Sequence, residues 1–423
     1  MSQSPFTRRQ LFRLGAGGVV VLGLGACDRR TSDSRSPSPT TSTKSTTSSS
    51  ATTSTTATTA ADGRPFGGRR LVLVQMNGGN DLLNTMPPND GRYMDLRPTI
   101  RVAETDRVSL AGLDDATLHP SLAPLVPHWD AGRMAIVRGI GFEAPNRSHF
   151  VSMDRWWRAD QLGGPGWLGV AMDTVPGETP PLFAAALGAG APVLAGVRSQ
   201  PTLIVSPDSF RFDGIDPAWI DAMAGGDGDD LTSAVRHAFA RTVDAVADLG
   251  RITAEEDTDE IPEREGGATI VNGLALAAEL LAGDVGTQVV VVSASGFDTH
   301  AGQVSTQAAL LQDLADGLVA FDAAMDAAGL ADEVMVVTTS EFGRRAVENG
   351  SGGTDHGAGG LSFVLGRGVR GGAHGHVDLG DLLDGDVRPV VDPLSLFTDC
   401  LEWLGLDPAT VLPRPASALG VLR

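Results

Sequence analysis

Short apolar runs alternate along this chain with longer segments in which apolar residues recur every three or four positions. The short runs predict strands buried on both faces, and the longer segments predict helices. The predicted strands are 71–76, 133–139, 287–295, 333–340 and 361–365, with shorter ones at 192–196 and 201–206. The predicted helices are 119–131, 229–250, 268–283, 303–328 and 394–404. This alternation predicts a three-layer αβα fold with a mainly parallel central sheet.

The glycine- and proline-rich region 160–230 is expected to be an excursion within one domain that spans residues 65–423. Polar residues gather where the predicted strands end. Three such clusters follow strands directly, a fourth comes soon after the third, and a fifth opens a helix shortly after strand 133–139: 77–81, 296–300, 341–344, 353–357 and 146–150. Because ligands of parallel sheets bind beyond the carboxyl ends of the strands, these clusters predict a site at that edge.

Two pairs of residues have the chemistry of metal ligands. Asp298 and His300 stand two apart in a loop, where a carboxylate and an imidazole can face one zinc or other divalent ion. Alternatively, Asp298 caps the following helix and His300 bonds locally. Asp355 and His356 are adjacent, so their side chains point to opposite sides and one of them, His356, is favoured as a ligand. The alternative is a glycine-rich turn.

Further candidate ligands follow the first and fourth long strands. Glu341 is a candidate third ligand, or else it pairs with Arg344 or Arg345. The segment after strand 71–76 offers ligands or backbone clamps in a sequence that also suits an ordinary turn: Asn77, Asn80 and Asp81.

Ser148 stands at the start of a predicted helix, where its hydroxyl could act as a nucleophile beside the positive end of the helix dipole. The alternative is an N-cap serine. Arg147 could hold an oxyanion in a bidentate fork. His149 is expected to be structural as readily as functional.

The charge excludes one class of function. The chain has 52 acidic and 32 basic residues, a formal charge of −20, so a protein that binds nucleic acid by neutralising phosphates is excluded. Cys27 and Cys400 are the two cysteines, which excludes a disulfide scaffold and a cysteine zinc site and makes Cys400 a small buried residue. There is no Walker A motif, no GxGxxG after the first strand and no GxSxG.

Residues 1–27 have the features of an export signal. Arg8 and Arg9 lie in a segment that resembles the twin-arginine signature, and the apolar stretch 14–26 is too short to span a membrane. It ends in Leu-Gly-Ala-Cys, which resembles a lipobox and would make Cys27 the lipidated first residue; a plain signal peptide is the alternative. Residues 28–64, rich in Ser, Thr, Pro and Ala, predict a flexible stalk. We therefore expect export by the twin-arginine translocase. We also expect a lipoprotein that is anchored at the outer face of the cell membrane or in the periplasm.

Several motifs in fixed order carry a family resemblance: QMNGGNDLLNTMPP, NRSHFVSMDRWW, GWLG, FDTH, SEFGRR, NGSGGTDHG and GRGVRGG. From about residue 70 to 405 the sequence resembles domain of unknown function 1501, a bacterial exported family grouped with the alkaline-phosphatase-like superfamily of phosphatases and sulfatases. The resemblance implies an alkaline-phosphatase-like fold and hydrolysis of phosphate or sulfate esters with two divalent ions, for which Zn, Mn or Ca are candidates.

The resemblance also implies roles for individual residues. Asp81, or Asn77, resembles the first ligand, and Ser148 is placed like the nucleophile. Asp298 and His300 resemble the middle pair, Glu341 the late-strand acid and His356 the last histidine.

The chain departs from the superfamily pattern at Phe342, where a histidine is usual, in the close spacing of Asp298 and His300, and in the asparagines after the first strand. Two ions, one or none therefore stay open. The first functional hypothesis is an anchored, metal-dependent hydrolase of anionic esters. The alternative, which Phe342 favours, is a non-catalytic envelope protein that keeps the fold for ligand binding or assembly.

Overall fold

The computed structural model describes residues 64–207, 210–212, 216–224, 231–253 and 270–423. The predicted export signal with Arg8, Arg9 and Cys27, the stalk up to residue 63 and the acidic segment 255–260 lie outside the described residues. Within the described residues, no helix has both the length and the apolar character needed to cross a membrane.

A sheet of eight strands forms the centre of the molecule, in the order β10-β4-β9-β8-β1-β7-β5-β6. Its pairings are parallel except those of β9, which runs against both neighbours. The predicted αβα class with a mainly parallel sheet is confirmed. The strands are β1 (Arg70–Met76), β4 (Met134–Ile140), β5 (Ala184–Leu187), β6 (Thr202–Ile204), β7 (Val289–Ala294), β8 (Val334–Thr339), β9 (Gly360–Leu365) and β10 (Gly372–Gly375).

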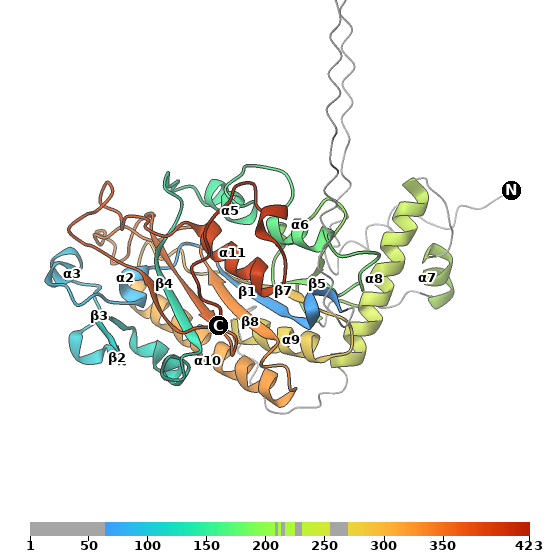
Figure 1. Ribbon diagram of the computed structural model, residues 1–423, viewed down its shortest axis with the longest axis horizontal. Coiled ribbons are helices and arrows are strands. Elements are labelled where there is room, and N and C mark those ends of the chain that lie inside the picture. Colours follow the sequence, from blue (N-terminus) through green and yellow to red (C-terminus); the bar gives the residue numbers. More distant parts are fainter. Residues whose placement is uncertain (1–63, 208–209, 213–215, 225–230, 254–269) are drawn as a thin grey trace, which may run out of the picture.

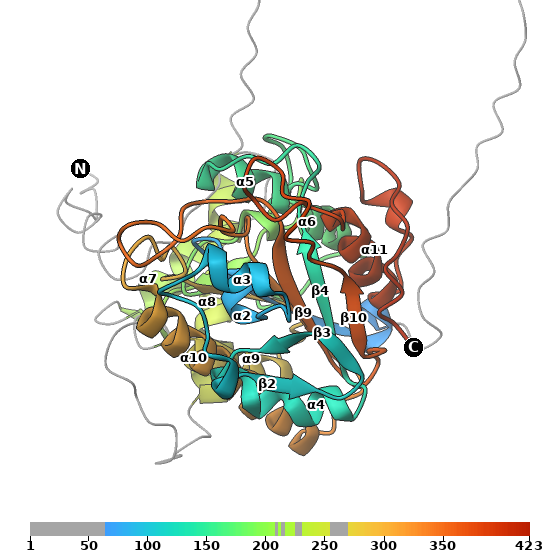
Figure 2. The ribbon, with the colours of Figure 1, turned by 90° about the vertical axis from the view of Figure 1, so that its left-hand side faces the viewer.

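Helices cover both faces of the sheet, as Figures 1 and 2 show. One face carries α9 (Ile270–Ala282) and α10 (Gln303–Ala327), and the other carries α5 (His149–Trp157), α6 (Trp167–Asp173) and α11 (Pro393–Trp403). Alternate residues of β1 enter the two cores, because successive side chains of a strand point to opposite faces. Val72 and Val74 belong to the core that contains Leu311. Leu71 belongs to the core that contains Phe397.

Smaller elements complete the described chain. The remaining helices and strands are α2 (Leu82–Thr85), α3 (Gly91–Leu96), β2 (Val108–Leu110), β3 (Leu113–Leu118), α4 (Val126–Asp130), α7 (Pro217–Ala224) and α8 (Leu231–Thr253). The 3₁₀ turns are η1 (Pro65–Gly68), η2 (Glu104–Asp106), η3 (Pro120–Leu125), η4 (Pro192–Leu194) and η6 (Pro408–Thr410). Cys400 is 1% exposed within α11, so its predicted burial is confirmed.

Two parts of the predicted fold are wrong. The segment predicted as strand 192–196 begins with the 3₁₀ turn η4, because Pro192 has no N–H to give to a strand ladder. Region 160–230 is not an excursion from the sheet, since it contributes β5 and β6 to one edge. β5 reads Ala-Ala-Ala-Leu, and because alanine has low strand propensity, a strand is not predictable there from local pattern.

His119 provides a test of this fold that depends on pH. Its Nδ1 accepts a hydrogen bond from the Ser121 N–H, 3.1 Å away, at the start of η3. Burial lowers the pKa of His119 from 6.5 to about 4. The unfolded chain therefore takes up a proton at a higher pH than the folded one, and stability falls as the pH drops from 6.5 to about 4.

We expect His119→Asn to flatten this part of the stability profile by up to about 3 kcal/mol, because asparagine keeps an acceptor for Ser121 and does not titrate. Urea unfolding of both proteins at several pH values measures the difference. Parallel pH profiles for the two proteins would contradict the prediction.

Candidate functional site

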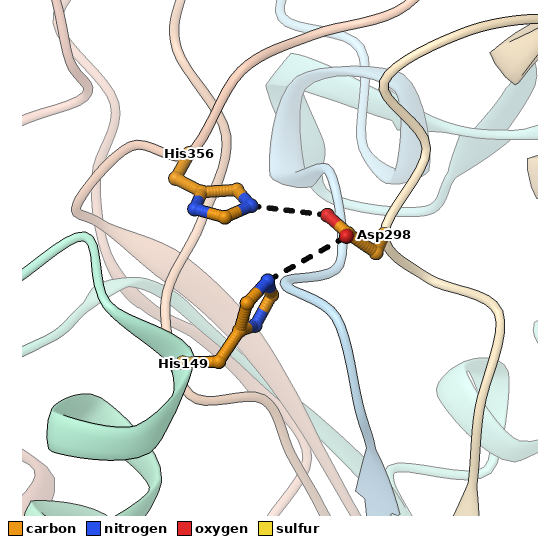
Figure 3. Close-up of side chains that lie close together, drawn as sticks. All are labelled: His149, Asp298 and His356. Carbon is orange, nitrogen blue, oxygen red and sulfur yellow. Dashed lines mark hydrogen bonds and ion pairs between the residues drawn. The ribbon is translucent and has the colours of Figure 1, made fainter.

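Three loops and one helix start meet at the carboxyl edge of the sheet. The loops are 77–81 after β1, 295–302 after β7 and 340–359 after β8, and the helix is α5. Four side chains from these elements come together: Asp298, His300, His356 and His149. Figure 3 shows His149 and His356 pointing at the Asp298 carboxylate from different elements.

Each of the three imidazoles is held by its Nδ1. His149 Nδ1 lies 2.7 Å from Glu341 Oε1, and His300 Nδ1 lies 3.2 Å from Asp355 Oδ1. His356 Nδ1 lies 2.8 Å from the carbonyl oxygen of Arg147. Carboxylate and carbonyl oxygens only accept hydrogen bonds, so each Nδ1 carries the proton and each neutral ring is left with a lone pair on Nε2.

All three Nε2 atoms face Asp298. His300 Nε2 and His356 Nε2 lie 2.9 Å apart, at 3.1 Å and 3.0 Å from Asp298 Oδ1. His149 Nε2 lies 3.6 Å from the other carboxylate oxygen, Oδ2. Lone pairs that face a carboxylate repel one another unless a cation lies between them.

This donor set fits a divalent cation. Imidazole and carboxylate are zinc ligands, and ligand atoms about 2.1 Å from one ion stand roughly 3 Å from each other, as the Asp298, His300 and His356 atoms do. Ligating histidines also typically donate their other ring N–H to a carboxylate or backbone carbonyl. Among the described residues His149, Asp298 and His356 stand out as a group that could hold a metal ion.

Asp298 stays ionised over the whole physiological range. Burial raises the pKa of its carboxyl, but the hydrogen bond and positive charge of the Arg344 guanidinium are the main effects that outweigh it, and the pKa is lowered to about 2. Its side chain is 46% exposed while that of Arg344 is fully buried. The site therefore opens to solvent on one side and rests on a buried positive charge on the other.

The aromatic residue at position 342 lies against the cluster. The Phe342 ring centroid is 5.0 Å from that of His149 and 4.7 Å from that of His356. A phenyl ring offers no ligand atom, so Phe342 orients the imidazoles by packing.

Glu341 is part of the site through His149. Its Oε1 accepts hydrogen bonds from His149 Nδ1 and from the Gly78 N–H, 2.9 Å away. It contacts neither Arg344 nor Arg345 in the hydrogen bonds and ion pairs of the described residues, so the predicted alternative pairing is wrong. Its Oε2 is buried without a partner in the described structure, and the residue lines a cavity of about 20 Å³, room for one water molecule.

The structure does not bring Asp81 or Asn77 into the cluster. Both Asp81 oxygens are taken by Arg97, by the Leu83 N–H that it caps and by Gln303. Asn77 Oδ1 accepts from Gln75. Both residues therefore depart from the predicted ligand set, because their oxygens are used to hold loops in place.

Ser148 and Arg147 lie directly beside the cluster. Ser148 is exposed and stands at the N-cap position of α5, as the alternative predicted, but its side chain makes no capping hydrogen bond. The Arg147 guanidinium donates to the buried carboxylate of Asp386, with Nε 3.0 Å from Oδ2. The predicted oxyanion fork is thus engaged elsewhere, while the Arg147 carbonyl holds His356.

Sequence reasoning missed the full roles of three residues. The sequence left the role of His149 open between structural and functional, although its place at the start of a helix beside Ser148 indicates that it faces the edge of the sheet. Asp355 accepts a hydrogen bond from His300. This agrees with its position next to His356, because adjacent side chains point to opposite sides and can contact different residues. Arg344, considered only as a partner of Glu341, instead contacts Asp298 at 2.6 Å; nothing in its local sequence indicates this.

One protein family matches part of the chain. The family described as "Protein of unknown function (DUF1501)" matches residues 226–418, so the resemblance carried by the motifs is confirmed over that segment. No curated protein matches the sequence.

Solved structures with a similar chain course include proteins from three bacteria. The lipoteichoic acid synthase LtaP from Listeria monocytogenes has 9% identity and a TM-score of 0.38, over 84% of this chain and 76% of that chain. A protein in the alkaline phosphatase superfamily from Vibrio parahaemolyticus has 9% identity and a TM-score of 0.39, over 84% and 71%. Alkaline phosphatase from the Antarctic bacterium TAB5 has 10% identity and a TM-score of 0.37, over 81% and 99%.

Gly78 allows the first loop to approach Asp298, and this gives a testable consequence. It has φ +122°, and a Cβ atom added to it would lie 2.2 Å from the Asp298 backbone nitrogen. We expect Gly78→Ala to displace the Asp298 loop, lower stability by roughly 2 kcal/mol or more and weaken zinc binding.

Gly372 provides the matched control. It also has a positive φ, +138°, but an added Cβ would meet no heavy atom within 4 Å. Gly372→Ala should cost stability and leave zinc binding unchanged. Thermal unfolding and zinc titration of both variants distinguish the two effects; equal zinc affinities would show that the Gly78 contact does not position Asp298.

Proposed function

We propose that the protein is a metal-dependent hydrolase of phosphate or sulfate esters. The observation that carries the proposal is the convergence of three imidazole Nε2 atoms, each with its Nδ1 hydrogen bond satisfied, on the ionised carboxylate of Asp298. Such oriented, lone-pair-bearing rings around one carboxylate are suited to hold a divalent ion and have no evident purpose in packing alone.

In this proposal, some residues of the chain would bind the metal ion and others would position the ligands. Asp298, His356 and His149 would hold the ion, and His300, whose Nε2 lies 2.9 Å from that of His356, would add a further ligand. When bound, the ion supplies positive charge that stabilises the developing charge on the ester oxygens. Glu341 and Asp355 fix the rings of His149 and His300, and Phe342 packs against two of them.

Ser148 is the proposed nucleophile. Its hydroxyl is exposed and is not used as a cap, and its neighbours on both sides in the chain contribute to the site. At the start of α5, free backbone N–H groups and the helix dipole favour an anionic group such as a phosphate or sulfate.

The substrate would lie outside the cytoplasmic membrane. The twin-arginine signature at Arg8 and Arg9, the lipobox-like end at Cys27 and the Ser/Thr-rich stalk support an exported protein that is anchored by lipid on the outer face of the membrane or in the periplasm.

The hydrolase proposal is tested on purified protein loaded with Zn²⁺ or Mn²⁺. We expect hydrolysis of p-nitrophenyl phosphate or sulfate esters, and we expect His356→Ala and Asp298→Asn to weaken metal binding by about 100-fold or more. Ser148→Ala should retain the metal and lose about 1000-fold or more of kcat. Metal content by mass spectrometry and steady-state kinetics provide the measurements.

His374→Ala is the control, since His374 lies on β10 outside the cluster and should change neither quantity. A protein that binds no metal would refute the proposal. A protein that binds metal but cleaves no ester of either class would favour the non-catalytic envelope protein instead.

The export proposal has a separate test in cells. We expect Arg8→Lys with Arg9→Lys to keep the protein in the cytoplasm, and Cys27→Ser to release it from the membrane without a palmitate label. Cys400→Ala should remain labelled, because the other cysteine is buried in the fold. Fractionation and palmitate labelling measure both effects, and an unlabelled wild-type protein would contradict the anchor.

A further inference from the structure

The Arg344 side chain lies in a cage of oxygen atoms beneath the site. Its guanidinium is fully buried, and its N–H groups face four backbone carbonyls and one carboxylate. The acceptors are the carbonyl oxygens of Gly78, Gly79, Phe297 and Thr354 and the Oδ1 atom of Asp298. Three of these five, from Gly78, Phe297 and Asp298, surround the single nitrogen Nη2.

Carbonyl and carboxylate oxygens gathered around one point are the donor set of a hard metal ion such as Ca²⁺. Here the point is occupied by the positively charged guanidinium of Arg344. It lies next to Asp298, 2.6 Å from the oxygen that also faces His300 and His356.

The charges around the site match one divalent ion. The carboxylates of Asp298, Glu341 and Asp355 carry three negative charges, and Arg344 offsets one, which leaves two. Two further buried acids nearby already have positive partners: Asp81 is paired with Arg97, and Asp386 is paired with Arg147 and, at 3.8 Å, with Arg345.

The ligand atoms also suffice for one ion. Within the described part of the chain, the imidazole Nε2 atoms converge on Asp298 alone, and the oxygens of Asp81 and Asp355 are engaged in hydrogen bonds. Glu341 Oε2 is a single further oxygen, which is not a ligand set.

We infer that the guanidinium of Arg344 takes the place of a second metal ion, so that this site holds one divalent cation beside one fixed organic cation. The inference rests on the proposed function for its first ion. It distinguishes this site from the two-ion chemistry that the family resemblance implies.

The first experiment counts ions in the full chain. After loading with excess Zn²⁺ and removal of free metal, mass spectrometry and calorimetric titration should both give one ion per chain. Two ions per chain would overturn the inference and leave the proposed metal-dependent function standing. No bound ion would overturn the proposed function itself.

The second experiment removes the guanidinium from among the five oxygen atoms that surround it. Arg344→Ala removes the guanidinium, so we expect Ca²⁺ at millimolar concentration to raise the melting temperature of the zinc-loaded variant by several degrees and to bind at one equivalent. The wild-type protein should show no such rise. Arg344→Lys, which keeps a cation near the cage, is the matched control and should also show none.

An equal response of Arg344→Ala and Arg344→Lys to Ca²⁺ would overturn the inference, because the cage would then not be a cation position. If Arg344→Ala does not fold in the absence of Ca²⁺, refolding with and without Ca²⁺ gives the same comparison. Recovery with Ca²⁺ supports the inference, whereas failure in both, together with two zinc ions in the wild-type chain, contradicts it.

Discussion

The buried guanidinium of Arg344 is the interaction on which the geometry of the site depends. The loops after β1, β7 and β8 are far apart in sequence, and each contributes at least one oxygen to this one side chain. Burying a positive charge costs much free energy unless each of its N–H groups has an acceptor. The three loops are therefore held in the positions at which their oxygens accept hydrogen bonds from Arg344. The position of Asp298, and through it of the imidazoles, follows from that requirement.

A second buried ion pair, between Arg97 and Asp81, also holds the loops in place. Arg97 and Asp81 are fully buried; Arg97 also donates to the carbonyls of Arg345 and Ala346, and Gln303 donates to Asp81. Removing one partner of such a pair typically costs about 3–5 kcal/mol, because an unpaired charge stays buried. Asp81, which the family resemblance would make a metal ligand, thus helps to hold Arg97 against the backbone that follows Arg344.

The sequence alone predicted the parts of this molecule that depend on local pattern. The Val-rich run of β7 and the apolar run of β1 are buried on both faces and were predictable as strands. The pair Asp298 and His300 and the choice of His356 over Asp355 followed from spacing. What could not be predicted depends on contacts distant in sequence: Arg344 with Asp298, Arg97 with Asp81, and the alanine-rich β5, whose strand conformation comes from pairing with β7.

The net negative charge of the whole chain would repel the anionic substrate of the proposed function, but screening over distance limits this repulsion. The net charge is −20, but at physiological ionic strength fields decay over about 8 Å, so exposed acids elsewhere on the surface are largely screened. Inside the site the charges are in contact and are screened much less. Without a metal ion, Asp298, Glu341 and Asp355 outweigh Arg344, and an anion would be repelled. One divalent ion brings the site to neutrality, and the charge nearest the substrate is then the metal ion, while Arg344 remains buried beneath Asp298. Under the proposed function, an anionic ester would therefore be attracted only to the metal-loaded site, and its binding would depend on the metal.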